Sequence, residues 1–227
     1  MPLIMGGYHT LKYNRWISLD ISTNTGFTIF AKNAAKDSNG YIIDSYGLIN
    51  AKITDYKSDI KKYSDFPDSY PVNFLYTSMV LAKEIRTLIQ EEKIEFVVIE
   101  HTEKGKQRLS QRTLEWFHFA ICNMLLEIDV PFKYLLVSDW RKEVSCYIKC
   151  WPEYIAYNKQ IKTAKKTAVP TKTGRILARI DGKVVSKIDQ KKLSIIIANQ
   201  TYDLSISDDN IADAINIGSA AIKLGLV

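Results

Sequence analysis

The sequence predicts an α/β fold, a mixed five-stranded sheet flanked by helices. Two observations support this prediction: three apolar runs follow one another near the start of the chain, and two helix–strand units come after them. The chain has 227 residues, 46% hydrophobic and 25% charged, which is enough for one domain with a substantial buried core. We therefore expect a single domain over residues 1–227, with a basic insertion at about 150–189.

The first three strands are expected to form an antiparallel meander. Residues 16–21 and 27–31 are apolar runs on either side of the turn-forming segment 22–26, and residues 41–49 form the third strand. Alternation along the first strand places Trp16, Ser18 and Asp20 on one face of the sheet and the intervening apolar residues on the other.

The later elements alternate between helix and strand. Helices are expected over residues 72–92, 108–128, 190–202 and 208–224, and strands over residues 94–100 and 132–137. The strand at 94–100 follows a helix, so it is expected to run parallel to its neighbour. Ser138 is expected to cap a short helix through Cys150. Asp181-Gly182 predicts a hairpin between 175–180 and 183–188, because both residues tolerate positive φ.

Positive charge is concentrated in one segment of the chain. The net charge is +6, but residues 141–192 alone carry +10, from fourteen Lys or Arg against four acids. The other 175 residues therefore sum to −4. A basic block on an acidic body indicates a polyanion-binding surface, and Tyr147, Trp151, Tyr154 and Tyr157 among the cations are typical of nucleic-acid stacking. The alternative is a merely solvated charged surface.

Several protein classes are excluded by composition. No apolar run approaches the roughly 18 residues of a membrane-spanning helix, and the chain does not open with a signal-peptide pattern. Three cysteines cannot all pair, which argues against a disulfide scaffold. We expect a cytoplasmic protein that is not secreted and has no membrane partner.

Two acids stand where apolar strands end. Asp20 closes the first strand, and Glu100 closes the run from Phe96 to Ile99. If these strands are parallel neighbours, their carboxyl ends meet at one edge of the sheet, where α/β proteins commonly place their sites. The purely structural alternatives are an Asx turn for Asp20 and simple solvent exposure for Glu100.

The last helix begins with a second pair of acids. Ser207 is a suitable N-cap, and acids in the first turn favour the helix dipole, which accounts for Asp208. It does not account for Asp213, which interrupts an apolar face one turn after Asp209. Like charges at this spacing disfavour a helix by about 0.2–0.5 kcal/mol unless a cation lies between them.

Asp20, Glu100, Asp209 and Asp213 thus form a candidate carboxylate cluster for catalysis and metal binding. Hard oxygen ligands without a His or Cys set favour Mg²⁺, with Mn²⁺ as a substitute, over zinc. Such a cluster supports two ions about 4 Å apart for hydrolysis of a phosphodiester.

These segments resemble the acidic motifs of RuvC-like Holliday-junction resolvases, which have a ribonuclease H-like fold. The matching stretches are Ile17-Ser18-Leu19-Asp20 with its turn, Val97-Val98-Ile99-Glu100, and Asp209-Asn210-Ile211-Ala212-Asp213, in the family's order and spacing. The resemblance implies a homodimeric, Mg²⁺-dependent endonuclease that nicks two strands of a four-way DNA junction. Asp20, Glu100 and Asp213 correspond to the family's metal-binding acids.

The sequence departs from the family in three places. The family usually spaces its last two acids by three residues, which would select Asn210; we choose Asp209, with Asp208 as the alternative. The segment after Glu100 is polar and basic where the bacterial enzymes carry an aromatic wedge. The basic insertion is larger than the bacterial enzymes need, which suits a phage-type member acting in a bacterial or phage-infected cell.

Nine basic residues are the candidate DNA contacts. They are Lys104, Lys106, Arg108, Arg141, Lys142, Lys165, Lys166, Lys172 and Arg175. For Arg141 and Lys142, just past the fifth strand, a purely surface role is the alternative to a phosphate contact near the site.

Two other functions are compatible with the predicted fold and are kept as alternatives. One is a ribonuclease H-type hydrolase of RNA–DNA hybrids, and the other is a catalytically silent junction-binding module. Retention of all the acids argues against the second. A sugar-kinase or actin-like ATPase is disfavoured, because no second phosphate loop is present and the chain is too short for two lobes.

Overall fold

The structure is a computed structural model, and it describes residues 13–33, 40–50, 69–101, 108–168 and 176–227. Its centre is a five-stranded sheet in the order β3-β2-β1-β4-β5. The strands are β1 (Arg15–Asp20), β2 (Asn24–Lys32), β3 (Tyr41–Asn50), β4 (Phe96–His101) and β5 (Phe132–Leu136). The β1–β2 and β2–β3 pairs are antiparallel, whereas β1–β4 and β4–β5 are parallel. The predicted mixed sheet is confirmed.

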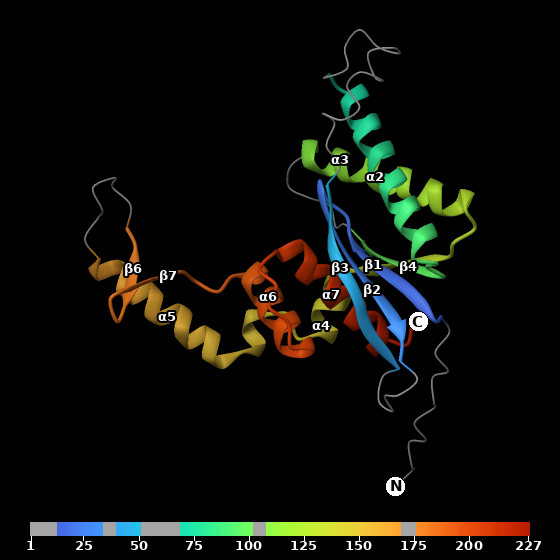
Figure 1. Cartoon of the computed structure of the whole chain (residues 1–227). Helices are drawn as coiled ribbons and strands as arrows, with labels where there is room; N and C mark the ends of the chain where they lie inside the picture. The colour runs from blue at the N-terminus through green and yellow to red at the C-terminus, as the bar shows by residue number, and fades with distance from the viewer. Residues whose placement is uncertain (1–12, 34–39, 51–68, 102–107, 169–175) are drawn as a thin grey trace.

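Helices cover both faces of this sheet (Figure 1). On one face lie α2 (Val72–Glu91) and α3 (Arg108–Glu127), which pack on Ile17 and Leu19 of β1. On the other lie α4 (Val137–Glu143), α6 (Gln190–Tyr202) and α7 (Asp209–Lys223), which pack on Trp16. The alternation predicted for the first strand therefore holds, and it directs Ser18 and Asp20 towards α7.

Two glycines allow α7 to lie close to the sheet. A Cβ on Gly26, in the paired segment that follows the β1–β2 turn, would stand 2.0 Å from the Asn210 carbonyl oxygen. A Cβ on Gly218 would stand 2.1 Å from the Phe30 ring. Neither distance is sterically possible without a shift of backbone or of a buried ring, so these glycines set the spacing between the acids on the sheet and those on α7.

The basic insertion forms an arm that projects away from the sheet (Figure 1). It contains the long helix α5 (Pro152–Thr167) and the short strands β6 (Ala178–Ile180) and β7 (Lys183–Val185). The predicted hairpin is present, with φ of 50° at Asp181 and 76° at Gly182, but its strands are shorter than expected. The helix α5 was not predicted from the sequence, and its polar and basic surface has only one fully buried side chain, Ile161.

Two local predictions were wrong. The helix after β5 ends at Glu143 and does not continue through Cys150; a separate 3₁₀ turn, η2 (Ile148–Cys150), follows it. The N-cap of the last helix is Asp208 and not Ser207, because the Asp208 carboxylate accepts hydrogen bonds from the backbone N–H groups of Asn210 and Ile211. Two such bonds outweigh the single one that a hydroxyl at Ser207 was expected to accept.

Among the described residues, no helix combines the length and the apolar character that crossing a membrane requires.

Candidate active site

Asp20 is a nearly buried carboxylate at the end of β1. Its side chain is only 8% exposed, although a lone carboxylate is costly to bury. Two positions earlier on the same face, the Ser18 hydroxyl donates to the Ala214 carbonyl oxygen of α7 at 2.7 Å. This contact ties β1 to the middle of α7, so the last residue on that face of β1 meets the first turns of the helix.

Glu100 lies beside Asp20 on the adjoining parallel strand. The β1–β4 register pairs Leu19 with Ile99, and each acid is the next residue of its strand. A side-chain hydrogen bond with Glu100 is one of the effects that raise the pKa of Asp20, so the two carboxyl groups interact directly. The indole N–H of Trp140 in α4 donates to Glu100 Oε1 at 2.8 Å and holds it at this edge of the sheet.

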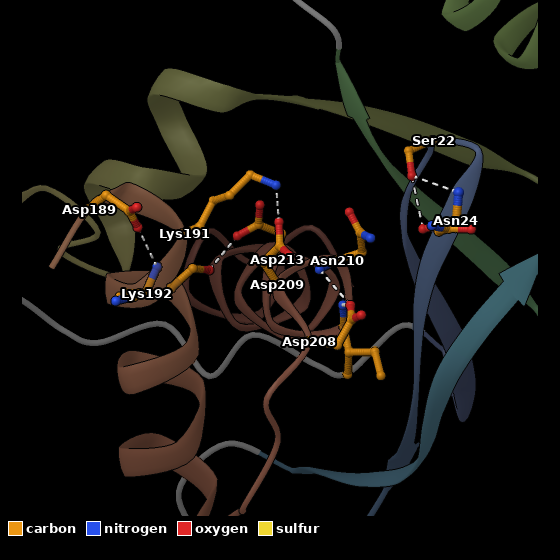
Figure 2. A network of polar contacts seen from close by, with 11 residues as sticks. Ser22, Asn24, Asp189, Lys191, Lys192, Asp208, Asp209, Asn210 and Asp213 are labelled. Atoms are coloured by element: carbon orange, nitrogen blue, oxygen red, sulfur yellow. Dashed lines mark hydrogen bonds and ion pairs between the residues drawn. The ribbon is translucent and has the colours of Figure 1, made fainter. Parts of the chain in front are cut away.

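The acids of α7 have separate partners (Figure 2). Asp208 is engaged as the helix cap, which favours Asp209 as the fourth acid of the cluster. Asp209 forms an ion pair with Lys191 of α6, and Asp213 accepts a hydrogen bond from the Ser194 hydroxyl one turn further along α6. Because α6 and α7 pack side by side, both acids of α7 are held from α6.

The four acids act on one another electrostatically. Burial raises the pKa of Asp20 well above its ordinary value of 3.8, and the charges of Glu100, Asp213 and Asp209 raise it further. Burial also raises the pKa of Asp213 to about 6, against the opposing effects of the Ser194 hydrogen bond and the Arg141 charge. A raised carboxyl pKa means that the negative form lacks compensation, so a bound cation would stabilise the cluster.

Carboxylate oxygens in a partly buried cluster are the donors that Mg²⁺ and Mn²⁺ prefer. The residue types of Asp20, Glu100, Asp209 and Asp213 therefore fit these ions. In the described part of the chain, however, no three His, Cys, Asp or Glu side chains are arranged to hold one metal ion. Three of the acids are instead held by donors on α4 and α6: Trp140, Ser194 and Lys191.

Arg141 is the only described DNA-contact candidate that lies at this cluster. Its guanidinium stacks over the Trp140 ring, 5.0 Å from the centroid, and its charge lowers the pKa of Asp213. Lys142 is exposed on α4, and Lys165 and Lys166 are exposed at the end of α5 on the arm. Four further candidates, Lys104, Lys106, Lys172 and Arg175, lie outside the described residues. Arg108 begins α3, but its side chain is not described.

Three residues of this site are not evident from the sequence pattern: Trp140, Ser194 and Lys191. Ser194 had a detectable signal, because it is a polar residue on the apolar face of α6 between Leu193 and Ile197. Lys191 was counted only as one of many cations. Which acid Trp140 reaches is not encoded in any local pattern, because Glu100 is 40 residues away in the chain.

Comparison of the sequence alone finds no matching protein-family model and no curated protein with significant similarity. Comparison of structures finds two structures of Thermus thermophilus RuvC, one of them in complex with a Holliday junction substrate. Each alignment covers 93% of this chain and 96% of the RuvC chain. The TM-scores are 0.54 with 9% identity for the complex and 0.55 with 10% identity for the other structure. The chain has the RuvC fold.

The predicted ribonuclease H-like architecture is thus confirmed in its RuvC form. The yeast mitochondrial Holliday junction resolvase Ydc2 also matches, with a TM-score of 0.45 and 11% identity over 93% of this chain and 79% of that one. At identities near 10%, the RuvC likeness establishes the fold. The site itself rests on the contacts described above.

Proposed function

We propose that this chain is a Mg²⁺-dependent, structure-selective endonuclease that resolves four-way DNA junctions by paired phosphodiester hydrolysis. Such an enzyme is a crossover-junction endodeoxyribonuclease, here one nuclease domain with a basic insertion, acting in the cytoplasm of a bacterial or phage-infected cell. The observation that carries the proposal is the cluster of Asp20, Glu100, Asp209 and Asp213 on the RuvC fold, in which burial and mutual repulsion raise the pKa of two of the acids.

In this mechanism, Asp20, Glu100 and Asp213 would hold the metal, with Asp209 as the fourth ligand. When bound there, two Mg²⁺ ions would supply activation of a water molecule and stabilisation of the leaving 3′ oxygen. The protein keeps the acids in place through the Trp140 indole and the Ser194 hydroxyl. Arg141, next to Asp213, is positioned to bind a backbone phosphate at the site.

DNA as the substrate is supported by the charge of the arm. The exposed cations of α5 include Lys159, Lys162, Lys165 and Lys166, on an element that packs little of its surface against the sheet (Figure 1). Phosphate contacts supply most of the affinity in such interfaces and make binding depend on salt. An arm of this kind suits a branched substrate, because it reaches DNA away from the strand being cut.

Paired cleavage also supports a homodimer, because two cuts at symmetric positions need two active sites. Exposed apolar side chains gather on α2 and α3, far from the acids: Met79 is 55% exposed and Phe119 is 68% exposed, beside a cavity of about 380 Å³ that Trp116 also lines. We place the dimer contact on this face. Phe119→Asp should therefore give a monomer in sedimentation analysis, whereas Tyr46→Asp on β3 should leave the dimer intact.

Two other functions remain to be distinguished: hydrolysis of the RNA strand of a hybrid, and binding of junctions without cleavage. The deciding experiment compares matched four-way-junction, flap, duplex and RNA–DNA substrates with Mg²⁺, with Mn²⁺ and with chelator. We expect paired nicks in the four-way junction that need the divalent ion. Preferred cutting of the hybrid would identify a ribonuclease, and tight junction binding without cleavage would identify a silent module.

A further inference from the structure

A groove separates α5 from β7 at the base of the arm. Its volume is about 630 Å³, within the range of about 300–1,000 Å³ typical of small-ligand sites. One wall consists of the aromatic rings of Tyr154 and Tyr157, and the other of aliphatic side chains that include Val184 and Ile188. Polar side chains, among them Ser186 and Lys192, stand along its rim.

The groove is held open by contacts that do not depend on a ligand. The Asn158 side-chain amide donates to the Ile188 carbonyl oxygen at 2.8 Å and accepts from the Ile188 N–H at 2.9 Å. This paired contact fixes the chain that leaves β7 against α5. The Tyr154 ring stacks on Trp151, with centroids 5.6 Å apart, which fixes the aromatic wall. A preformed site loses little conformational freedom when it binds its ligand.

The groove and the acid cluster share the first turn of α6. Lys191 forms the ion pair with Asp209, whereas the next residue, Lys192, donates a hydrogen bond to Ser186 on the rim of the groove. Figure 2 shows both lysines at the head of α6, with Asp209 and Asp213 next to it. A DNA strand with a phosphate at the acids would therefore pass over the head of α6 and reach the groove.

The lining identifies the class of ligand. Aromatic and aliphatic walls suit the faces of a planar ring, and base–aromatic stacking of this kind is a common way to hold unpaired nucleotides. Ser186 and Glu153 offer hydrogen-bonding groups for the edge of a base. Lys192 and the exposed lysines of α5 supply positive charge for the adjoining phosphates.

We propose that this groove binds one unpaired nucleobase close to the scissile phosphate and thereby gives the enzyme a base preference. The inference rests on the proposed function, because it places the strand being cut at the acid cluster. The inference also goes beyond the proposed function, because a base-binding role is assigned to residues of the arm that are not part of the carboxylate site.

The test is a scan of abasic sites through a four-way junction, with binding measured in chelator so that no strand is cut. At one position near the crossover, loss of the base should weaken binding by the wild-type protein about tenfold, the scale of one stacked base. Tyr157→Ala should bind the intact junction about tenfold less well and be insensitive to that abasic site. Tyr157→Phe should behave as wild type, because it keeps the ring.

Two further variants make the scan decisive. Val184→Glu, at a side chain that is 54% exposed, puts a negative charge in the groove without a folding cost and should reproduce the loss. Tyr46→Ala on β3, the same chemical change at a tyrosine that is 40% exposed, should match wild type. If no position shows a loss that depends on Tyr157, the groove is not a base site, while junction binding and Mg²⁺-dependent nicking of the intact substrate keep the proposed function. If wild-type protein does not bind the junction, both fail.

Discussion

The carboxylate site and the basic arm differ both in the sign of their charges and in how far these charges are exposed to water. At the site, Asp20 and Asp213 are largely buried like charges, and donors from α4 and α6 hold the cluster. On the arm, the cations of α5 are exposed, and contacts within the arm, such as the Asn158–Ile188 pair, join α5 to the chain that leaves β7. Water screens the charges of the arm, whereas the charges of the site have only protein to compensate them.

This difference predicts how each region responds to mutation. Catalysis at a carboxylate cluster depends on the position of each oxygen, so single changes in the body should be severe. Binding of a polyanion depends on the sum of many exposed charges, so removal of single cations from the arm should have small, additive and salt-dependent effects. The following predictions test this contrast, beginning with the largest effect.

Asp20→Asn or Asp213→Asn should abolish Mg²⁺-dependent nicking. We expect a loss of more than about 100-fold, because changes that only support a metal ligand already cost roughly 10- to 100-fold. Junction binding should be unchanged or tighter, since a neutral side chain no longer repels phosphate. Nicking rate and binding affinity are measured on the same junction. Asp129→Asn, at an exposed residue after α3, is the matched control, and undiminished nicking by either site variant would remove the acids from the mechanism.

Ser194→Ala should lower the nicking rate by roughly 10- to 100-fold while it preserves junction binding. The hydroxyl holds Asp213 and lowers its pKa, so its loss should also move the pH–rate profile to higher pH. Ser194→Thr keeps the hydroxyl and should restore the profile. A lower rate with an unmoved profile in the alanine variant would indicate that Ser194 only packs α6 against α7.

Neutralising Lys165 and Lys166 together to Gln should weaken junction binding and reduce the slope of log K against log salt by about 2, at roughly 0.9 per phosphate contact. The nicking rate at saturating protein should not change. Affinity measured over a salt series provides the readout. Lys32 and Lys133, exposed at the end of the sheet away from the acids, form a matched pair whose replacement should leave the slope as it is. An unchanged slope in the α5 variant would show that the arm lies off the DNA path.

Without metal, the protein should become less stable as pH rises from about 4 to about 7. The folded state holds the Asp213 proton more tightly, with a pKa of about 6 against 3.8, so between these values it binds more protons than the unfolded state. The free energy of unfolding then falls as pH rises. Mg²⁺ should reverse this, because it binds the deprotonated acids, with melting shifts of about 2–4 °C per kcal/mol at this chain length.

Thermal unfolding at both pH values, with and without Mg²⁺, measures these shifts. Asp213→Asn should reduce the metal-free pH dependence, since an asparagine amide does not titrate in this range, and the raised pKa of Asp20 accounts for the part that remains. A melting temperature that does not respond to Mg²⁺ at either pH would contradict a metal site at the cluster.

Much of the fold could be predicted from local pattern. The alternation in β1 identified which side chains face α7, and Asp181-Gly182 identified the hairpin, because each depends on neighbours in the chain. The N-cap of α7 was predicted wrongly because Ser207 and Asp208 are both residue types that suit this position. The backbone geometry at the start of α7 selects Asp208. The helix α5 went unpredicted because only Ile161 on it is fully buried, so its apolar stripe is weak among many polar and charged residues.

Part of the site could be predicted as well. Asp20, Glu100 and the α7 acids could be identified as candidates. An acid at the end of an apolar strand, or within an apolar helix face, is costly to bury and therefore indicates a special role. Their partners Trp140, Ser194 and Lys191 were not identified, since each contact joins two separate elements and depends on how those elements pack.

The amino-acid sequence alone determined the order of the five sheet strands and of the helices that pack on the sheet, the concentration of positive charge in residues 141–192, and the positions where acids interrupt apolar segments. Only the tertiary structure decided that Asp208 caps a helix while Asp209 faces Lys191, that Trp140 holds Glu100, and that a groove opens beside the head of α6. The reason is physical: periodicity and charge are properties of neighbours along the chain, whereas hydrogen bonds, burial and repulsion between distant acids depend on how the elements pack.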